Sequence, residues 1–479
     1  MADSLKHKTV HGIVWSSIER FSVQGVQFLV TLVIANILDP KDFGLVGMLL
    51  IFLAVSQSLI DSGFSQALIR KQNRTETDNS TVFYFNILVS VFLYILLYAI
   101  APLVADFYQE SQLVSLMRVL CIIVIINSLA VVQRAIYTAK VDFKTQAKAS
   151  FIASVISGCV GVFLALNGYG VWTLVWQQLL NAGINTLLLW LYSSWKPRLV
   201  YSWKSFRELF AFGSKLLASG LLDTLYNNLY PLVIGKVFNA TSLGYYTQAD
   251  RFTKFPSSNI TGILQRVIYP VLCSIQDDNE RLRNDYRRLL RCSAFIIFPL
   301  MCLLAGVSYP LIELLLGEKW LFAATFMIPL CFNMMWYPIH AINLNLLQVK
   351  GRSDLFLKLE IIKKVIGVFL LVCSVPFGVL VMCYVGILQS VIALAINTYY
   401  TGKLINVGFY IQIKDLSGIL TVSLSMFTLV FLTSIFINDL IIKLVSGVVL
   451  GLVFYCGIAF LLKFKELETI KDIVKNGKG

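Results

Sequence analysis

The segment VIANILDPKDFG, residues 33–44, returns without a gap as VIGKVFNATSLG at residues 233–244. A second pair, GVFLALNGYGV at residues 161–171 and GVFLLVCSVPFGV at residues 367–379, aligns with a two-residue gap. The first pair is separated by 200 residues and the second by 206 to 208, so the two separations agree. This agreement indicates an internal duplication with a period of about 200 residues, and periodic self-similarity of this kind decides the architecture.

The composition identifies the solvent of the folded chain. Hydrophobic residues make up 57% of the sequence and charged residues only 14%, and the mean hydropathy is +0.76. Such a chain cannot bury its apolar surface in a water-soluble globule, which predicts an integral membrane protein. The apolar runs are about 20 residues or longer, the length of a membrane-spanning helix and roughly twice that of a barrel strand. We therefore predict an all-α polytopic membrane protein.

Scanning for long apolar runs predicts about fourteen spans. They lie at residues 10–37, 43–66, 81–105, 113–137, 147–166, 171–194, 207–237, 243–273, 289–315, 321–348, 356–375, 377–402, 416–437 and 441–462. With the duplication, this map predicts a six-helix lobe at residues 1–200, a second at residues 201–403, two additional helices at residues 404–462 and a cytoplasmic amphipathic tail at residues 463–479. The basic segment DDNERLRNDYRRLLR, residues 277–291, is likewise expected to lie along the anionic inner leaflet.

Lysine and arginine are distributed unevenly among the predicted loops. Alternate loops are basic, for example residues 70–74, 140–148 and 281–288, whereas the loops between them contribute few cations. The positive-inside rule then places both termini in the cytoplasm. The formal net charge of +14 is explained by these topological clusters, so no nucleic-acid partner is expected.

The duplication also constrains the mechanism. Six is an even number, so both lobes have the same orientation and are related by an axis along the membrane normal. Two such lobes can enclose a central cavity that opens to either side, which is the basis of alternating access in many transporters. The alternative is a gene duplication that carries no transport function.

The segment LGYYTQADRFTKFPSSN, residues 243–259, places charges inside a predicted span. Counting about 1.5 Å per residue from Leu243 puts Lys254 roughly 17 Å deep, near the middle of the bilayer. Each charge at that depth costs about 2.5 to 3.5 kcal/mol on insertion scales, which favours a watery cavity over lipid as its surroundings. Arg251 and Lys254 share a helix face, while Asp250 and Lys254 can form an ion pair. Pro256 is expected to kink this helix, either as a flexing point or as a static bend.

Other predicted spans carry charges at similar depth, whereas four are almost purely apolar. The latter, residues 81–105, 289–315, 416–437 and 441–462, are expected to face lipid. The candidates for a cationic cavity that binds an anionic head group are Arg20, Lys215, Arg251, Lys254, Lys363 and Arg266. The carboxylates available for coupling to a proton or Na⁺ are Glu19, Asp61, Asp223 and Asp250. For both sets the alternative is a group of interhelical ion pairs that holds the helices together.

Motifs for cofactors and metals are missing from the sequence. The nine cysteines contain no C-x-x-C pair and the three histidines are scattered, so no metal site is expected. The sequence also lacks a D-x-D motif, a glycine-rich phosphate loop and a Walker lysine, which argues against ATP-driven chemistry. We expect no cofactor other than a coupling ion.

Five segments in order resemble a known family: SGFSQALIRKQ (62–72), NGYGVWTLV (167–175), LGYYTQADRFTKFP (243–256), IYPVLCSIQDD (268–278) and LLLGEKW (314–320). Together they are similar to Wzx-type polysaccharide flippases, which share a superfamily with multidrug and toxin extrusion antiporters and the peptidoglycan lipid II flippase. The resemblance covers about residues 5–405. It implies export of undecaprenyl-pyrophosphate-linked oligosaccharides across the bacterial cytoplasmic membrane, with membrane lipids and a polysaccharide polymerase as neighbours.

Other functions remain open at this stage. The two extra predicted helices resemble those of the lipid II flippase, so a peptidoglycan precursor is one alternative. A multidrug antiporter of the same superfamily is another, although it would be expected to present acidic and aromatic groups to cationic drugs. A membrane polymerase or glycosyltransferase belongs to a different class, and it would usually need a larger extramembrane loop than the 10 to 15 residues available here.

Overall fold

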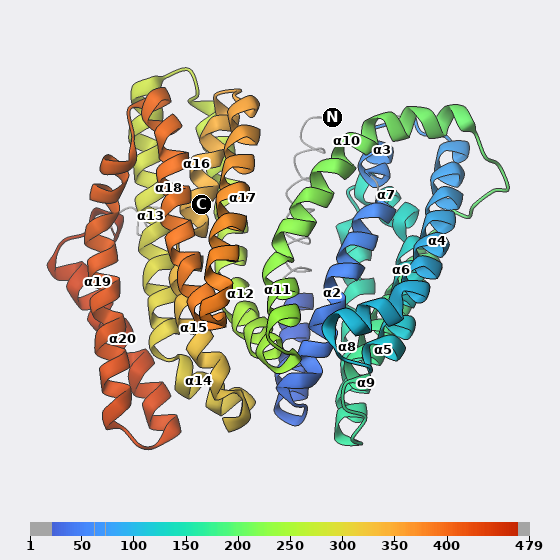
Figure 1. Ribbon diagram of the computed structural model, residues 1–479. Coiled ribbons are helices and arrows are strands. Elements are labelled where there is room, and N and C mark those ends of the chain that lie inside the picture. The colour runs from blue at the N-terminus through green and yellow to red at the C-terminus, as the bar shows by residue number, and fades with distance from the viewer. Residues whose placement is uncertain (1–21, 62, 72, 468–479) are drawn as a thin grey trace. The chain divides into compact units, whose positions relative to one another are not determined.

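The computed structural model describes residues 22–61, 63–71 and 73–467, and every regular element in these ranges is a helix (Figure 1). This confirms the all-α prediction. Packing divides the chain into two compact units, with the division between Gly244 and Tyr245. Helices occupy each of the fourteen expected ranges, and several ranges hold two or three consecutive helices where one was expected.

The first unit contains a series of helices connected by short loops. They are Ser22–Ile37, α2 (Pro40–Asp61), α3 (Phe64–Arg70), α4 (Glu76–Tyr108), α5 (Leu113–Leu120), α6 (Ile122–Ser128), α7 (Val131–Ala139), α8 (Phe143–Leu166), α9 (Trp172–Tyr192), α10 (Trp203–Asn227) and α11 (Leu229–Val237).

The second unit begins within a long helix. Its elements are α12 (Ala240–Ser274), α13 (Asn279–Gly306), α14 (Ser308–Leu316), the 3₁₀ turn Glu318–Trp320, α15 (Leu321–Met334), α16 (Tyr337–Val349), α17 (Ser353–Ser374), the 3₁₀ turn Val375–Phe377, α18 (Val379–Ile405), α19 (Phe409–Phe436) and α20 (Leu440–Leu461).

Nine helical segments in the described part of the chain are long and apolar enough to cross a membrane. The chain is therefore a multi-pass membrane protein. Helices α10, α12 and α17 are not among the nine, and these are helices in which the sequence places charged residues. The total of fourteen spans stays a prediction.

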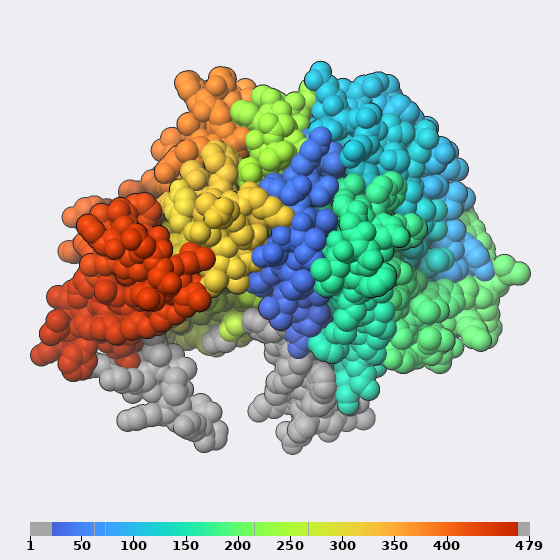
Figure 2. Space-filling model, turned by 90° about the horizontal axis from the view of Figure 1, so that it is seen from below, coloured from blue at the N-terminus to red at the C-terminus, as the bar shows by residue number. Residues whose placement is uncertain are grey.

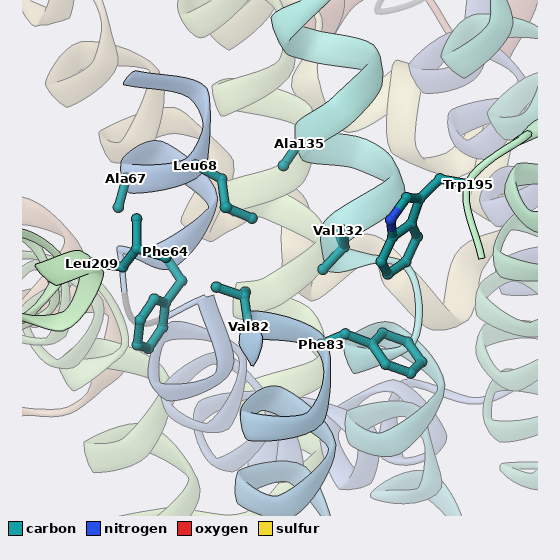
Figure 3. Packing of buried hydrophobic residues seen from close by; sticks show 9 residues of the cluster. All are labelled: Phe64, Ala67, Leu68, Val82, Phe83, Val132, Ala135, Trp195 and Leu209. Atoms are coloured by element: carbon teal, nitrogen blue, oxygen red, sulfur yellow. The ribbon is translucent and has the colours of Figure 1, made fainter. Parts of the chain in front are cut away.

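Apolar and aromatic side chains hold α10 in the first unit. Figure 3 shows a cluster in which Phe64 and Leu68 of α3 lie with Val82 and Phe83 of α4 and with Leu209 of α10. Phe64 is fully buried. Because α10 packs on α2 and α3, the compact unit ends at Gly244, later than the lobe boundary expected between residues 200 and 201. Packing defines the units and duplication defines the lobes, so the lobe boundaries stay a prediction.

A set of polar side chains, Lys71, Thr75, Asp78 and Glu208, holds the N-terminus of α4 beside this cluster. The Thr75 hydroxyl and the Asp78 carboxylate form a capping box that begins α4, an arrangement that satisfies otherwise unpaired backbone N–H groups. Lys71 Nζ lies 3.1 Å from Asp78 and 3.0 Å from Glu208 of α10. Burial alone would lower the pKa of Lys71, but its hydrogen bonds to Glu208 and Asp78 raise it above the ordinary value. Through Lys71, these ion pairs therefore join α10 to α4.

Helix α13 is the central helix of the second unit. It packs on α15, α16, α19 and α20, and more of its apolar stretch is buried than of the apolar stretch of α20. Much of α13 therefore contacts other helices, and the expectation that residues 289–315 face lipid stays a prediction for the exposed side chains of this range, such as Ile296 and Leu314. Leu282 and Tyr286 at the start of α13 are fully buried, so the expectation that residues 277–291 lie on the membrane surface is wrong. The sequence alternates cations with apolar residues there because one face packs against α19.

The two additional helices, α19 and α20, pack against α13 and α14, as the contact between red and yellow surfaces in Figure 2 shows. Arg287 donates two hydrogen bonds of 2.6 Å to the Asp415 carboxylate of α19. Arg291 lies 3.0 Å from Glu466, which follows α20. Bidentate pairs of this type combine strength with fixed geometry, so the additional helices are anchored firmly to the second unit. The amphipathic tail expected at residues 463–479 lies mostly outside the described residues.

Candidate functional site

Helix α12 has one buried and one exposed face within the second unit. Phe252, Thr253 and Ser257 are buried, and the Ser257 hydroxyl donates a 2.8 Å hydrogen bond to the Met334 carbonyl where α15 ends. Arg251, by contrast, is exposed. The helix therefore packs through small polar and aromatic groups and leaves its cations accessible.

The expected ion pair on α12 is confirmed. Lys254 Nζ lies 2.7 Å from the Asp250 carboxylate, four residues earlier. The Lys254 side chain is 52% exposed and that of Asp250 is 19% exposed, so the ammonium group is solvent-accessible while the carboxylate lies closer to the protein. Helix α12 continues through Pro256, and a functional kink at this proline stays a prediction. The accessible positive charge of this turn comes from Arg251 and Lys254.

A second ion pair lies on α17. Lys363 Nζ and the Glu360 carboxylate are 2.5 Å apart, and both side chains are mostly buried. A lysine that is already paired presents less positive charge to a ligand than a free one. Lys363 can therefore bind an anion most effectively when Glu360 is displaced or screened.

Several predicted site residues are not placed with these pairs. Glu19 and Arg20 lie outside the described residues, as does the side chain of Lys215. Asp223 on α10 and Arg266 on α12 are exposed. Each of these two side chains interacts with another group, so neither is a free charge.

In the first unit, Asp61 belongs to a chain of polar side chains. Asn127 on α6 donates a 3.0 Å hydrogen bond to Gln57, and Gln57 donates a 3.4 Å hydrogen bond to Asp61. Arg134 on α7 is close enough for its charge to act on Asp61. The sequence predicts Asp61 as a candidate but not its partners, because hydrogen-bonding partners on other helices leave no local pattern.

A buried polar network in the second unit was also missed. The Gln412 side-chain nitrogen, which has two N–H groups to donate, lies 3.0 Å from Asn343 Oδ1, 3.1 Å from Thr401 Oγ1 and 3.3 Å from the Tyr286 hydroxyl. These four residues are almost completely buried. Buried amides that are satisfied in this way fix helix register in a membrane bundle. The only signal in the sequence was the occurrence of amides within apolar runs.

The described site residues are thus divided between the two compact units. Arg251, Lys254 and Lys363 belong to the second unit, whereas Asp61 and Asp223 belong to the first. A single chamber formed by the cations of both lobes stays a prediction.

A family model described as "Polysaccharide biosynthesis protein" matches residues 33–325, more than half of the chain. The chain belongs to this family. Three relatives have related descriptions. The teichuronic acid biosynthesis protein TuaB of Bacillus subtilis is 27% identical over 354 residues, which cover 74% of this chain and 73% of TuaB. The lipopolysaccharide biosynthesis protein WzxC of Escherichia coli is 25% identical over 421 residues, which cover 87% of this chain and 83% of WzxC. The succinoglycan biosynthesis transport protein ExoT of Rhizobium meliloti is 22% identical over 324 residues, which cover 67% of this chain and 66% of ExoT.

Solved structures show which fold this polysaccharide biosynthesis protein adopts. A lipid II flippase, MurJ in an inward closed conformation, matches with a TM-score of 0.74 at 17% identity, covering 94% of this chain and 99% of MurJ. An inward-facing multidrug transporter of the MATE family matches with a TM-score of 0.63 at 17% identity, covering 82% of this chain and 98% of the transporter. The likeness at this identity shows the fold alone, and it confirms the expected all-α fold with several membrane spans.

Proposed function

We propose that the protein is a flippase that moves undecaprenyl-pyrophosphate-linked oligosaccharides from the cytoplasmic to the outer leaflet of a bacterial cytoplasmic membrane. The observation that carries the proposal is the membership of the polysaccharide biosynthesis family together with a fold that matches nearly the whole of a lipid II flippase. The relatives named above are associated with three different surface polysaccharides, which supports a shared transport step and leaves the sugar unspecified.

The charges of α12 support an anionic head group as the part of the substrate that is recognised. A pyrophosphate is best bound by lysine and arginine donors, whose hydrogen bonds to phosphate oxygens are charge-assisted. Arg251 and Lys254 are both exposed on α12, and the sequence predicts that they lie at a depth where a charge without a polar neighbour is costly. In this proposal the cations receive the head group, while Asp250 limits their net charge.

Transport of this kind changes the position of the substrate and leaves its covalent bonds intact, so we infer a transporter and not an enzyme. The driving force in this proposal is an ion gradient, the membrane potential or removal of the product by a polymerase on the outer side. Among the residues that the structure describes, the candidates for coupling to a proton or Na⁺ are Asp61, Asp223 and Asp250. The distribution of lysine and arginine supports an orientation with both termini in the cytoplasm.

The experiment is a complementation assay in a strain that lacks its own flippase for a defined surface polysaccharide. Expression of this protein is expected to restore surface polysaccharide and to reduce the lipid-linked units that accumulate inside. Charge-removing changes at Arg20, Lys215 and Arg251 are expected to reduce surface polysaccharide while membrane insertion is retained. Wild-type export by all three variants would overturn the cationic site, and failure to complement any polysaccharide pathway would overturn the function.

A further inference from the structure

The segment between α9 and α10 has no regular structure, yet its backbone is held in place. In Figure 1 it is the green loop that leads into α10. Hydrogen bonds connect it to the first two turns of α4: Trp195 Nε1 to Glu76 at 2.7 Å, the Arg198 backbone N–H to Ser80 at 3.1 Å and the Ser202 backbone N–H to Thr81 at 3.0 Å. The Ser202 hydroxyl also caps the start of α10. The side chains of this segment therefore project from a fixed frame.

Large apolar side chains of this segment and of the first turns of α10 are exposed. Leu199 is 94% exposed, Trp203 56% and Tyr201 49%. The rings of Trp203 and Phe210 stack on Phe206, with centroid separations of 4.9 Å and 5.3 Å, and Phe206 packs against the buried cluster of α3 and α4. Stacking of this kind fixes the aromatic rings at the surface of the first unit.

The same surface is cationic. Residues 196–207 contain four cations and no acidic residue: Lys196, Arg198, Lys204 and Arg207. All four are exposed, and the Arg207 guanidinium lies 5.5 Å from the centre of the Trp203 ring, within the range of a cation–π contact. The acidic residue that follows, Glu208, is paired with Lys71. Cations and exposed aromatic rings thus share one surface, called here the 196–207 surface.

Its position beside α4 places this surface at the boundary of a membrane. Helix α4 is long and apolar enough to span a bilayer. Its first turn carries Glu76 and Asp78, and mostly apolar residues follow from Val82 onward. A segment bonded to the turns where polar residues give way to apolar ones lies at the level of the lipid head groups. Tryptophan and tyrosine are enriched at that level, and clustered lysine and arginine there attract anionic lipids.

A lipid surface matches this chemistry better than a protein partner does. A protein would have to cover the apolar rings and also supply acids for four cations, whereas a leaflet with anionic lipids supplies both at this position. The basic segment at residues 277–291 differs, because its apolar side chains Leu282 and Tyr286 are buried. Exposure of apolar groups together with cations is what distinguishes the 196–207 surface.

We propose that the 196–207 surface binds the head groups of anionic phospholipids. Leu199 and Trp203 insert among the lipids, and the four cations contact the lipid phosphates. Because Trp203 stacks on Phe206, bound lipid holds the start of α10 against α3 and α4. The site concerns membrane lipid and not the transported glycan, so it goes beyond the proposed function and does not depend on it.

The test measures fluorescence quenching in the purified full-length protein in nanodiscs. The nanodiscs contain phosphatidylcholine and a small fraction of a lipid brominated on acyl carbons near its head group, either phosphatidylglycerol or phosphatidylcholine. Subtracting the signal of Trp203→Phe, in the wild type and in each variant, isolates the fluorescence of Trp203. In the wild type this fluorescence is expected to be quenched more strongly by brominated phosphatidylglycerol than by brominated phosphatidylcholine.

Lys196→Gln combined with Lys204→Gln is expected to reduce the preference for phosphatidylglycerol by at least about fivefold, the contribution of about one cation near an anionic surface. Both side chains are exposed, so their replacement removes little packing. Lys140→Gln combined with Lys148→Gln is the matched control, because it removes two exposed cations from another basic loop of the first unit. This control is expected to keep the wild-type preference.

Three results would overturn the inference. Trp203 fluorescence that neither lipid quenches would show that the surface faces water or another protein. Equal quenching by the two lipids would show a lipid contact without a site for anionic head groups. An equal loss of preference in the control would show that general charge attracts the lipid. The complementation assay is a separate measurement, so failure of the lipid site and failure of the flippase function are distinguishable.

Discussion

Gly44 on α2 lies directly against the backbone of Ala240 at the start of α12. A Cβ atom added at Gly44 would be 1.6 Å from the Ala240 carbonyl oxygen. The contact is reciprocal, because a Cβ atom at Gly244 would be 1.9 Å from the Pro40 carbonyl oxygen. The sequence repeat aligns Gly44 with Gly244 and Pro40 with Ala240, so the duplicated segments meet through equivalent positions. The first turns of two helices can approach this closely because each has a glycine, Gly44 or Gly244, at the contact, as in small-residue contacts of membrane helices.

Gly44→Ala should therefore separate α2 from α12 and impair export strongly. The added methyl group meets backbone and cannot be accommodated by a side-chain rotation, so overpacking of at least about 1 to 3 kcal/mol is expected. Thermal unfolding in detergent and the complementation assay measure the two effects. Gly183→Ala on α9 is the matched control, since nothing lies within 4 Å of its added Cβ. Equal stability and export for both variants would contradict the close contact.

Gly63→Ala should also destabilise the first unit. Gly63 has φ of 68°, and an added Cβ would be 2.5 Å from the Gly213 carbonyl oxygen of α10. The substitution combines an unfavourable backbone conformation with a clash, at a cost of at least about 1 kcal/mol. A lower midpoint of thermal unfolding is the expected readout. A midpoint unchanged from the wild type would show that α10 does not pack tightly on α3.

Asp415→Ala should loosen the attachment of α19 to α13. Asp415 is 8% exposed and accepts both hydrogen bonds from Arg287, so the variant leaves a partly buried cation without its partner. A loss of about 2 to 4 kcal/mol is expected, somewhat below the cost of breaking a fully buried pair because Arg287 is 31% exposed. A double-mutant cycle with Arg287→Ala measures the coupling. Additive effects of the two substitutions would rule out the pair as the anchor.

Lys254→Gln and Arg251→Gln should each reduce export without lowering stability. Both side chains are exposed on α12, so their removal costs little packing, but each removes a donor for the phosphate group. Lys358→Gln on α17 removes another exposed cation near the expected cytoplasmic end and is the control. Surface polysaccharide is measured at matched protein levels. If Lys358→Gln reduced export as much as the α12 variants, general charge and not a specific site would be responsible.

The helices were predictable because about 20 consecutive apolar residues can only be accommodated as a membrane span. The breaks within spans were not. The expected span 113–137 is three helices, α5, α6 and α7, with interruptions at Cys121 and at Leu129 and Ala130. No glycine or proline marks these positions in the sequence, so tertiary packing must select them.

Pairing between residues on different helices could not be predicted from the sequence either. The i, i+4 spacing correctly predicted the pair of Asp250 and Lys254, since helix geometry is local. The pairing of Arg287 with Asp415 joins residues far apart in the chain, and nothing in the sequence connects them. For the same reason residues 277–291 were expected on the membrane surface, although their apolar face packs against α19.

The most direct test of the central claim measures translocation itself. The purified protein is reconstituted in proteoliposomes with an undecaprenyl-pyrophosphate-linked oligosaccharide whose sugar lies on one leaflet. A membrane-impermeant enzyme that modifies the sugar is present on the side of the other leaflet. The fraction of sugar that becomes accessible to this enzyme is followed over time. We expect rapid appearance of the sugar with the wild type and slow appearance with Arg251→Gln and Lys254→Gln combined. The same slow rate in liposomes with and without the wild-type protein would contradict it.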